Sequence, residues 1–172
     1  MWAKKKQNEN GFTIVELLIV IVVIAILAAI TIVSYNGIQA RSRDSVRRQD
    51  LAQITKLMKM YQVDNGDYAE AGCGSGTGYG WFAVDYDGAG PLKSISQCLI
   101  DTGFLMKTIK DPGGLDACAG LTCYAYMKAS CGGNTYLYAH LETLPQSSTD
   151  LDGSCYPTWD TSYGMNYIRQ VN

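Results

Sequence analysis

A run of 22 mostly apolar residues near the N-terminus constrains this chain more than any other feature. Residues 12–33 contain only three polar side chains, Thr13, Glu16 and Thr31. A helix of that length rises about 33 Å, which is enough to cross a hydrocarbon layer of about 30 Å. A carboxylate inside such a span costs roughly a few kcal/mol. The sequence therefore predicts a membrane-spanning helix in which Glu16 has a functional role.

The helical pattern continues beyond the apolar run. Residues 34–63 lack proline, and only Gly37 interrupts a segment rich in good helix formers. Apolar residues recur there at helical spacing, at Leu51, Ile54, Met58 and Tyr61. The other faces are expected to carry polar side chains: Arg47, Arg48, Gln53, Lys56 and Lys59. The pattern predicts one helix over residues 12–63, which spans the membrane in 12–33 and is amphipathic in 34–63.

The remaining residues, 64–172, indicate a small domain of class α+β. Residues 72–80 are rich in glycine and are expected to form an irregular loop. A short helix is predicted over 94–104, with Ser94 as its N-cap. Alternating apolar residues predict antiparallel strands over 123–129, 135–142 and 166–171, with a turn at 131–134 between the first two. Because so small a sheet buries little by itself, we expect it to cover the apolar stripe of the helix.

All six cysteines follow the apolar run: Cys73, Cys98, Cys118, Cys123, Cys131 and Cys155. An even number confined to one side of a membrane span indicates an oxidising compartment and disulfide bonds. Six cysteines allow 15 pairings, of which the spacing slightly favours a loop between Cys118 and Cys123. Metal binding is the less favoured alternative, because the chain has no CxxC pair. The cysteines place the C-terminal part outside the cytoplasm and the N-terminus inside it.

The charge of the chain argues against nucleic acid as an obligatory partner. Fourteen basic and sixteen acidic residues give a net charge of −2. Four arginines follow the apolar run closely, at positions 41, 43, 47 and 48. Such a run forms a solvated face, or pairs with acidic groups such as Asp44 and Asp50 on neighbouring helices. DNA binding through these arginines is a minor alternative.

The segment Gly11-Phe12-Thr13-Ile14-Val15-Glu16, followed by the apolar run, resembles the type III signal of type IV pilins and pseudopilins. The resemblance implies a pilin-like fold, with a long N-terminal helix packed on a small antiparallel sheet tied by disulfides. It also implies that residues 1–11 are a leader, which a prepilin peptidase removes after Gly11 before it methylates the amine of Phe12. Glu16 would then pair with the Phe12 ammonium of a neighbouring subunit during assembly, and residues 64–172 would form the extracellular head.

Two positions depart from the family's usual pattern. Many members have a glycine where this chain has Ala25 and a proline where it has Val33. Those helix breakers are associated with a helix that partly unwinds in the filament. Since alanine is a strong helix former, we expect less unwinding here.

The function that the resemblance implies is a structural pilin subunit of a cell-surface filament that serves motility, adhesion or DNA uptake. Its partners would be copies of itself, other pilins, the prepilin peptidase, an assembly platform and its ATPases, and, before assembly, the membrane. A pseudopilin of a secretion or competence system is an alternative, and a membrane-tethered binding domain that never polymerises is another. No catalysis and no cofactor are expected.

Two further sets of residues have a simpler interpretation than a functional site. Asp150 and Asp152 resemble half of a calcium loop, but a turn is the favoured interpretation because the later glutamate is missing. His140 has no partner that the sequence places beside it, and we expect it on the surface of a strand.

Overall fold

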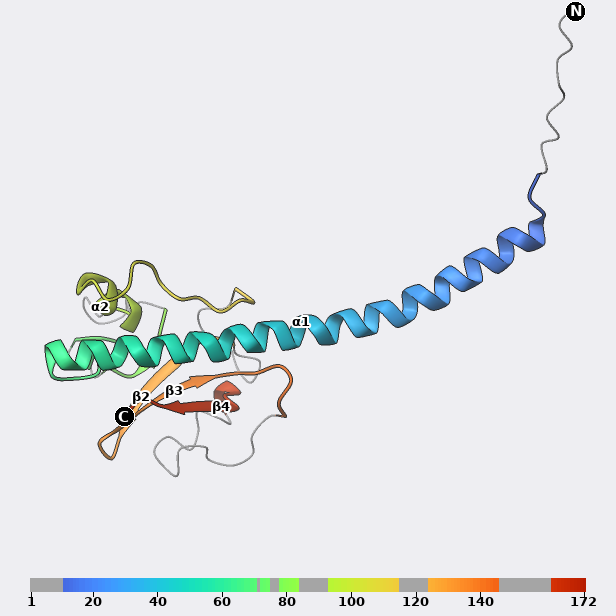
Figure 1. The fold of residues 1–172 in the computed structure, drawn as a ribbon. Coiled ribbons are helices and arrows are strands. Elements are labelled where there is room, and N and C mark those ends of the chain that lie inside the picture. Colours follow the sequence, from blue (N-terminus) through green and yellow to red (C-terminus); the bar gives the residue numbers. More distant parts are fainter. Residues whose placement is uncertain (1–10, 71, 75–77, 84–92, 115–123, 146–161) are drawn as a thin grey trace, which may run out of the picture. The chain divides into compact units, whose positions relative to one another are not determined.

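A computed structural model of the chain describes residues 11–70, 72–74, 78–83, 93–114, 124–145 and 162–172. These residues group into two compact units, and the boundary in the sequence lies between Gln39 and Ala40. The long helix α1, Ile14–Asn65, contributes its first half to the first unit and its second half to the other (Figure 1).

Helix α1 begins and ends two residues later than predicted. At its start, the backbone N–H of Glu16 donates to the hydroxyl of Thr13, which is therefore the N-cap. At its end, Gly66 has a φ of +86° and donates its N–H to the carbonyl of Gln62. Only glycine takes this left-handed conformation without strain, so the helix stops there. Between these ends α1 is one uninterrupted helix that includes Ala25 and Gly37.

The described strands form one antiparallel sheet in the order β1-β2-β3-β4, as the α+β prediction requires. Their bounds are Gly80–Trp81, Met127–Cys131, Asn134–Ala139 and Tyr167–Gln170. The prediction that residues 72–80 form only irregular loop is wrong at Gly80, which pairs with Lys128. Strand β2 also starts later and ends later than predicted, because its pairing with β3 continues to the turn.

The turn between β2 and β3 is tighter than the predicted four residues. Cys131 pairs with Asn134, which leaves only Gly132 and Gly133 between the strands. Their φ angles are +58° and +81°. Two consecutive positive φ angles define a type I′ turn, whose twist matches that of the strands it joins.

The main core of the second unit lies between α1 and the sheet, as predicted. The apolar stripe of α1 is buried at Leu51, Ile54, Met58 and Tyr61, where it packs with Leu137 of β3. Helix α2, Ile95–Asp101, adds Ile95 and Leu99 to the same core, and Figure 1 shows it across α1 from the strands. Ser94 caps α2 as expected, but the helix ends before Phe104.

The opposite face of the sheet carries a second apolar cluster. Met127, Ala129 and Tyr138 are buried there. Side chains that pack against them include Tyr79, Trp81, Tyr136, Tyr163 and Ile168, and the rings of Trp81 and Tyr163 meet edge to face at 5.2 Å. Both faces of this small sheet are therefore apolar, which explains why aromatic residues are frequent in its strands.

A disulfide joins Cys73 to Cys98, with 6.1 Å between the two Cα atoms. It connects the segment that follows α1 to α2. Cys131 is also disulfide-bonded. The remaining cysteines, including the favoured pair Cys118 and Cys123, lie outside the described residues together with Cys155.

Candidate functional site

The first candidate site is the start of α1, where Thr13 and Glu16 form a capping box. The Glu16 carboxylate accepts hydrogen bonds from the backbone N–H of Thr13 at 2.7 Å and from its hydroxyl at 2.8 Å. The Thr13 hydroxyl in turn accepts the Glu16 N–H at 3.2 Å. This reciprocal arrangement satisfies N–H groups that a helix start leaves without a partner. The T-x-x-E spacing of Thr13 and Glu16 is the sequence signature from which such a box can be predicted.

Both accepted hydrogen bonds go to one oxygen of Glu16, Oε2. The other oxygen, Oε1, meets no donor among the described residues. Phe12 lies one turn before it, with 83 % of its surface exposed. Phe12, Glu16, Ile19 and Val20 line an open hollow on this side of the segment. The arrangement offers an acceptor oxygen beside an apolar surface.

The first half of α1 is long and apolar enough to cross a membrane, judged by its length and composition. Every described residue from Gly11 to Ile32 is exposed within this chain. Large apolar side chains such as Ile14 and Ile30 expose more than half of their surface. Because exposed apolar surface of this extent marks a contact with lipid or with another protein, this half of α1 is a contact surface.

A second cluster of functional groups lies where α1 enters the second unit, and it overturns one prediction. Arg47 was expected on a polar, exposed face of the helix, yet its side chain is fully buried. Its guanidinium donates to Asp111 at 2.6 Å, to Glu142 at 2.7 Å and to Asp44 at 2.9 Å. It also lies 4.5 Å from the centre of the Tyr124 ring. Burial is tolerated because nearly every donor of the guanidinium finds an acceptor.

Asp44 joins the same cluster to the segment after β3. Its carboxylate accepts the N–H groups of Glu142 and Thr143, both at 2.8 Å, and the Thr143 hydroxyl at 2.7 Å. Burial by itself raises the pKa of Asp44, but these hydrogen bonds and the one from Arg47 outweigh it, so the pKa lies below its usual value. Asp44 therefore pairs with Arg47 of its own chain and not with an arginine of a neighbouring helix.

Arg43 completes the cluster by a two-pronged ion pair with Glu142, in which its Nε donates at 2.7 Å. Hydrogen bonds from Arg43 and then from Arg47 hold the pKa of Glu142 below its usual value. The spacing of Asp44 and Arg47 suits a helical pair, but the sequence gives no sign that Asp111 and Glu142 join them, because they lie 64 and 95 residues from Arg47. Two of the four arginines are thus committed to the fold.

His140 follows the end of β3 and is half-buried, so the prediction of an exposed strand residue is wrong. Its ring stacks on that of Tyr124, with 4.7 Å between the ring centres. Burial, and then the charge of Arg47, lowers its pKa. Because the neighbouring Glu142 is held by two arginines, the arrangement does not pair His140 with that carboxylate for acid–base work.

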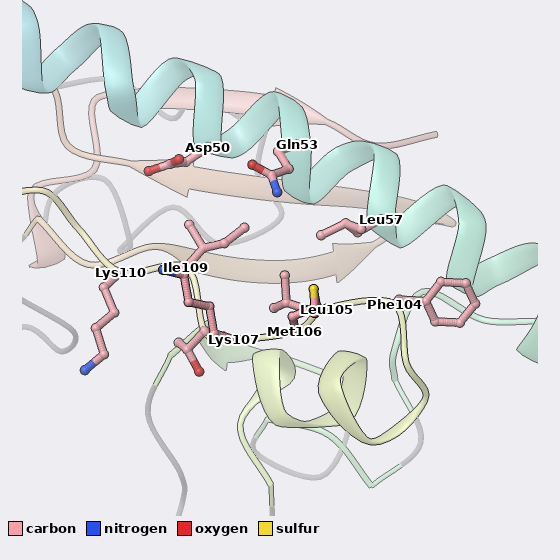
Figure 2. Close-up of a pocket in the computed structure, with 10 residues that line it drawn as sticks. Asp50, Gln53, Leu57, Phe104, Leu105, Met106, Lys107, Ile109 and Lys110 are labelled. Carbon is pink, nitrogen blue, oxygen red and sulfur yellow. The ribbon is translucent and has the colours of Figure 1, made fainter.

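An open groove of about 870 Å³ runs between α1 and the segment after α2 (Figure 2). Leu57, Phe104, Leu105 and Ile109 give it apolar walls, and Lys107 and Lys110 stand at its rim. Its acidic group is Asp50, which accepts a 2.6 Å hydrogen bond from the Tyr126 hydroxyl. Burial raises the pKa of Asp50. The groove is therefore mainly apolar, with one carboxylate and two lysines among its lining residues.

Lys128 is a further buried charge that the sequence did not reveal. Its register partner in β3 is Leu137, so it points toward α1, and its amine donates to the carbonyl of Gly78 at 2.9 Å. Burial lowers its pKa to about 8. The described residues hold no group of three or more potential metal ligands, and the calcium candidates Asp150 and Asp152 lie outside them.

Comparison with known proteins bears on the first of these sites. Residues 6–32 match the family described as "Prokaryotic N-terminal methylation motif". The chain is 45 % identical over 62 residues to the type IV wide pilus major component PilA4 of Thermus thermophilus. It is 28 % identical over 64 residues to the type II secretion system core protein G of Pseudomonas aeruginosa. By its N-terminal segment, the chain is similar to type IV pilins and to type II secretion pseudopilins.

The likeness to these pilins and pseudopilins is limited in extent. The two alignments cover 36 % and 37 % of this chain and 47 % and 45 % of the relatives, so the chain spans less than half the length of the curated relatives it matches. The type IV major pilin protein PilA of Myxococcus xanthus is 37 % identical over 63 residues, which are 37 % of this chain and 29 % of that protein. No solved structure matches this chain. The N-terminal segment with the methylation motif is thus the part that this chain shares with these relatives.

Proposed function

We propose that this chain is a structural subunit that polymerises through α1 into a type IV pilus filament on the cell surface. The observation that supports this most directly is the methylation motif at the start of a helix whose apolar residues, from Ile14 to Ile32, are all exposed. A surface of that extent must be covered, first by lipid and then by other subunits. In this proposal the chain performs no catalysis and needs no cofactor.

The first step of the proposal is processing in the membrane. A prepilin peptidase cuts between Gly11 and Phe12 at the cytoplasmic face and methylates the new amine of Phe12. The structure supports the accessibility of that bond, because residues 11–13 precede α1 and are exposed. A protease needs backbone that lies outside a hydrogen-bonded helix. The capping box marks the start of α1, and this bond lies just before it.

The second step is assembly through Glu16. The carboxylate of one subunit pairs with the Phe12 ammonium of its neighbour, so that only one axial stagger of the packed helices satisfies both charges. The capping box is compatible with this pairing, since it uses Oε2 and leaves Oε1 available. A buried carboxylate that is paired and hydrogen-bonded is tolerated where an isolated one is costly.

Substitution of Glu16 tests the assembly step. Glu16→Ala should leave membrane insertion and cleavage after Gly11 unchanged and reduce sheared fibres at least about tenfold, because a desolvated ion pair is lost. Thr31→Ala is the matched control, since Thr31 is a polar residue of the same apolar run whose hydroxyl donates to the carbonyl of Ala28. Normal fibres from Glu16→Ala would refute the proposal.

A pseudopilin of a type II secretion or competence system is the second candidate, favoured by the likeness to core protein G. The amount and place of the mature chain distinguish the candidates. Long fibres sheared from cells and built mainly of this chain indicate a pilin. Short fibres confined to the cell envelope indicate a pseudopilin, and a chain that stays in the membrane indicates a tethered binding domain.

A further inference from the structure

One exposed side of α1 is strongly basic within the second unit, and at its edge the Arg48 guanidinium lies 5.6 Å from the centre of the Tyr167 ring of β4. Arg41, Arg48, Lys56 and Lys59 are all exposed, and their spacing of seven, eight and three residues places them on one side of the helix. We call these four residues the basic face. Its members repel one another, and the acidic residues of this part of α1 point elsewhere, since Asp44 is buried with Arg47 and Asp50 lies in the groove.

The end of the same helix is acidic. Asp64, Asp67 and Glu70 lie within seven residues, and the sequence has no lysine or arginine from residue 60 to residue 92. We call these three residues the acidic end. Asp64 is exposed in the last turn of α1, which contains no basic residue. A negative charge is unfavourable there because the helix dipole is negative at its C-terminus.

The acidic end is also fixed in place. Asp67 accepts the N–H of Glu70, and Glu70 accepts a 2.7 Å hydrogen bond from the Ser130 hydroxyl of β2. The Asp64 carboxylate accepts no hydrogen bond among the described residues. The buried Lys128 interacts with the charges of Asp67 and Glu70, so Asp64 is the exposed member of the acidic end, and an exposed basic surface lies along the side of α1.

We propose that the basic face of one copy binds the acidic end of a second copy, with Asp64 opposite Arg41 or Arg48. This inference rests on the proposed function and deepens it, because it names a second contact between subunits. The two surfaces lie at different places on one chain, so the contact is head-to-tail and can repeat without closing. Residue 64 lies 16 residues beyond Arg48 and 23 beyond Arg41, so parallel copies would be displaced by roughly 24 to 35 Å along the helix.

Two observations favour a second copy over a polyanion such as DNA. The whole chain has a net charge of −2, which disfavours binding to a phosphate backbone. The exposed side of α1 also presents apolar side chains beside the cations, with Val46 exposed by 40 %, Met60 by 55 % and Val63 by 79 %. Apolar surface among charges suits a protein partner, whereas phosphate contacts are mainly polar.

Charge reversal tests this contact in full-length chain expressed in cells that assemble it. Arg41→Glu/Arg48→Glu and, separately, Asp64→Lys should each lower the amount of the chain in sheared fibres at least about tenfold, because like charges then face each other. The triple variant, which exchanges the signs, should recover most of the lost yield. Lys93→Glu is the matched control, because Lys93 is exposed beside α2 and outside the basic face, and loss of its surface pair with Asp101 should have little effect.

Two results would overturn the proposed contact, provided that thermal unfolding shows each variant to be folded. The first is an unchanged fibre yield in Arg41→Glu/Arg48→Glu. The second is a triple variant whose fibre yield is no better than that of Asp64→Lys alone. Unchanged fibres with loss of DNA binding would assign the basic face to a polyanion instead. In those cases fibres of the unmodified chain leave the proposed function intact, whereas the absence of such fibres refutes both.

Discussion

At the scale of single residues, the cluster around Arg47 joins three segments that lie far apart in the sequence. It links α1 to the turn at Asp111 and to the segment at Glu142. Two arginines and three carboxylates take part, so each charge has an opposite neighbour. The cluster therefore fixes the loops that border α1 where the helix enters the second unit.

Removal of Arg47 should destabilise this unit strongly. Arg47→Met leaves Asp44 and Asp111 buried without a cation, which typically costs about 3–5 kcal/mol. Arg47→Lys should restore only part of the loss, because lysine lacks the planar fork that reaches several acceptors. Urea unfolding of the full chain in detergent measures both. Arg41→Met, at an exposed position, is the control, and an equal loss from that variant would contradict the role given to Arg47.

Because the pKa of Lys128 is lowered, we expect the stability of the chain to depend on pH in the alkaline range. Its pKa is about 8 in the folded chain, below the ordinary value of 10.5. Between these values the unfolded chain binds more protons, so the contribution of this residue to folding is complete above pH 10.5 and is lost as the pH falls through 8. A shift of this size corresponds to about 3 kcal/mol.

The comparison of unfolding free energies at pH 8 and pH 10.5 measures this effect. The unmodified chain should gain stability relative to Lys128→Met across that range, because methionine has no proton to exchange. Lys107→Met, which changes an exposed lysine, should behave like the unmodified chain. Parallel pH profiles of Lys128→Met and the unmodified chain would show that Lys128 titrates normally.

At the scale of elements, periodic sequence patterns predicted the features that depend on residues close together in the chain. The long helix, its buried stripe and the Ser94 cap of α2 could be predicted, because each depends on neighbouring residues. Strand ends were less predictable, since β2 continues to Cys131 only because β3 pairs with it. Strand β1 has two residues in a glycine-rich segment, and only its pairing with β2 makes it a strand. Strand β1 therefore depends on a tertiary contact and not on its local sequence.

The type I′ turn between β2 and β3 gives a prediction for one element. Gly132 has a φ of +58°, and no atom lies within 4 Å of the place where a Cβ would be. Backbone conformation alone therefore decides the outcome. Gly132→Asn should be nearly neutral because asparagine takes this conformation readily, whereas Gly132→Val should cost about 1–2 kcal/mol. Thermal unfolding of the two variants measures the difference, and equal midpoints would argue against the type I′ turn.

At the scale of the whole molecule, the candidate site divides into a part that the sequence predicts and a part that it does not. Gly11, Phe12 and Glu16 lie close together in the sequence, so their motif can be recognised without a structure. The basic face can be identified only from the structure, in which ion pairs hold Arg43 and Arg47 within the fold while Arg41 and Arg48 stay exposed. Long-range contacts decide which charges of a helix remain available, and spacing alone does not reveal them.

The disulfide between Cys73 and Cys98 should stabilise the head by restricting its unfolded state. It closes a loop with a sequence separation of 25 residues. Loop-closure entropy for that length corresponds to about 3 kcal/mol. Cys73→Ser/Cys98→Ser should therefore lower the unfolding midpoint in urea, and the unmodified chain after reduction should show at least the same loss. Identical midpoints for the double variant and the oxidised chain would contradict this contribution.

The proposed function requires that α1 is the polymerising element of a processed subunit. The most direct test is mass spectrometry of the chain in fibres sheared from cells. We predict that the chain in these fibres begins at Phe12, carries one added methyl group on the amine of Phe12, and makes up most of the fibre. A chain that still begins at Met1, or that is absent from the fibres and remains in the membrane, would contradict the account.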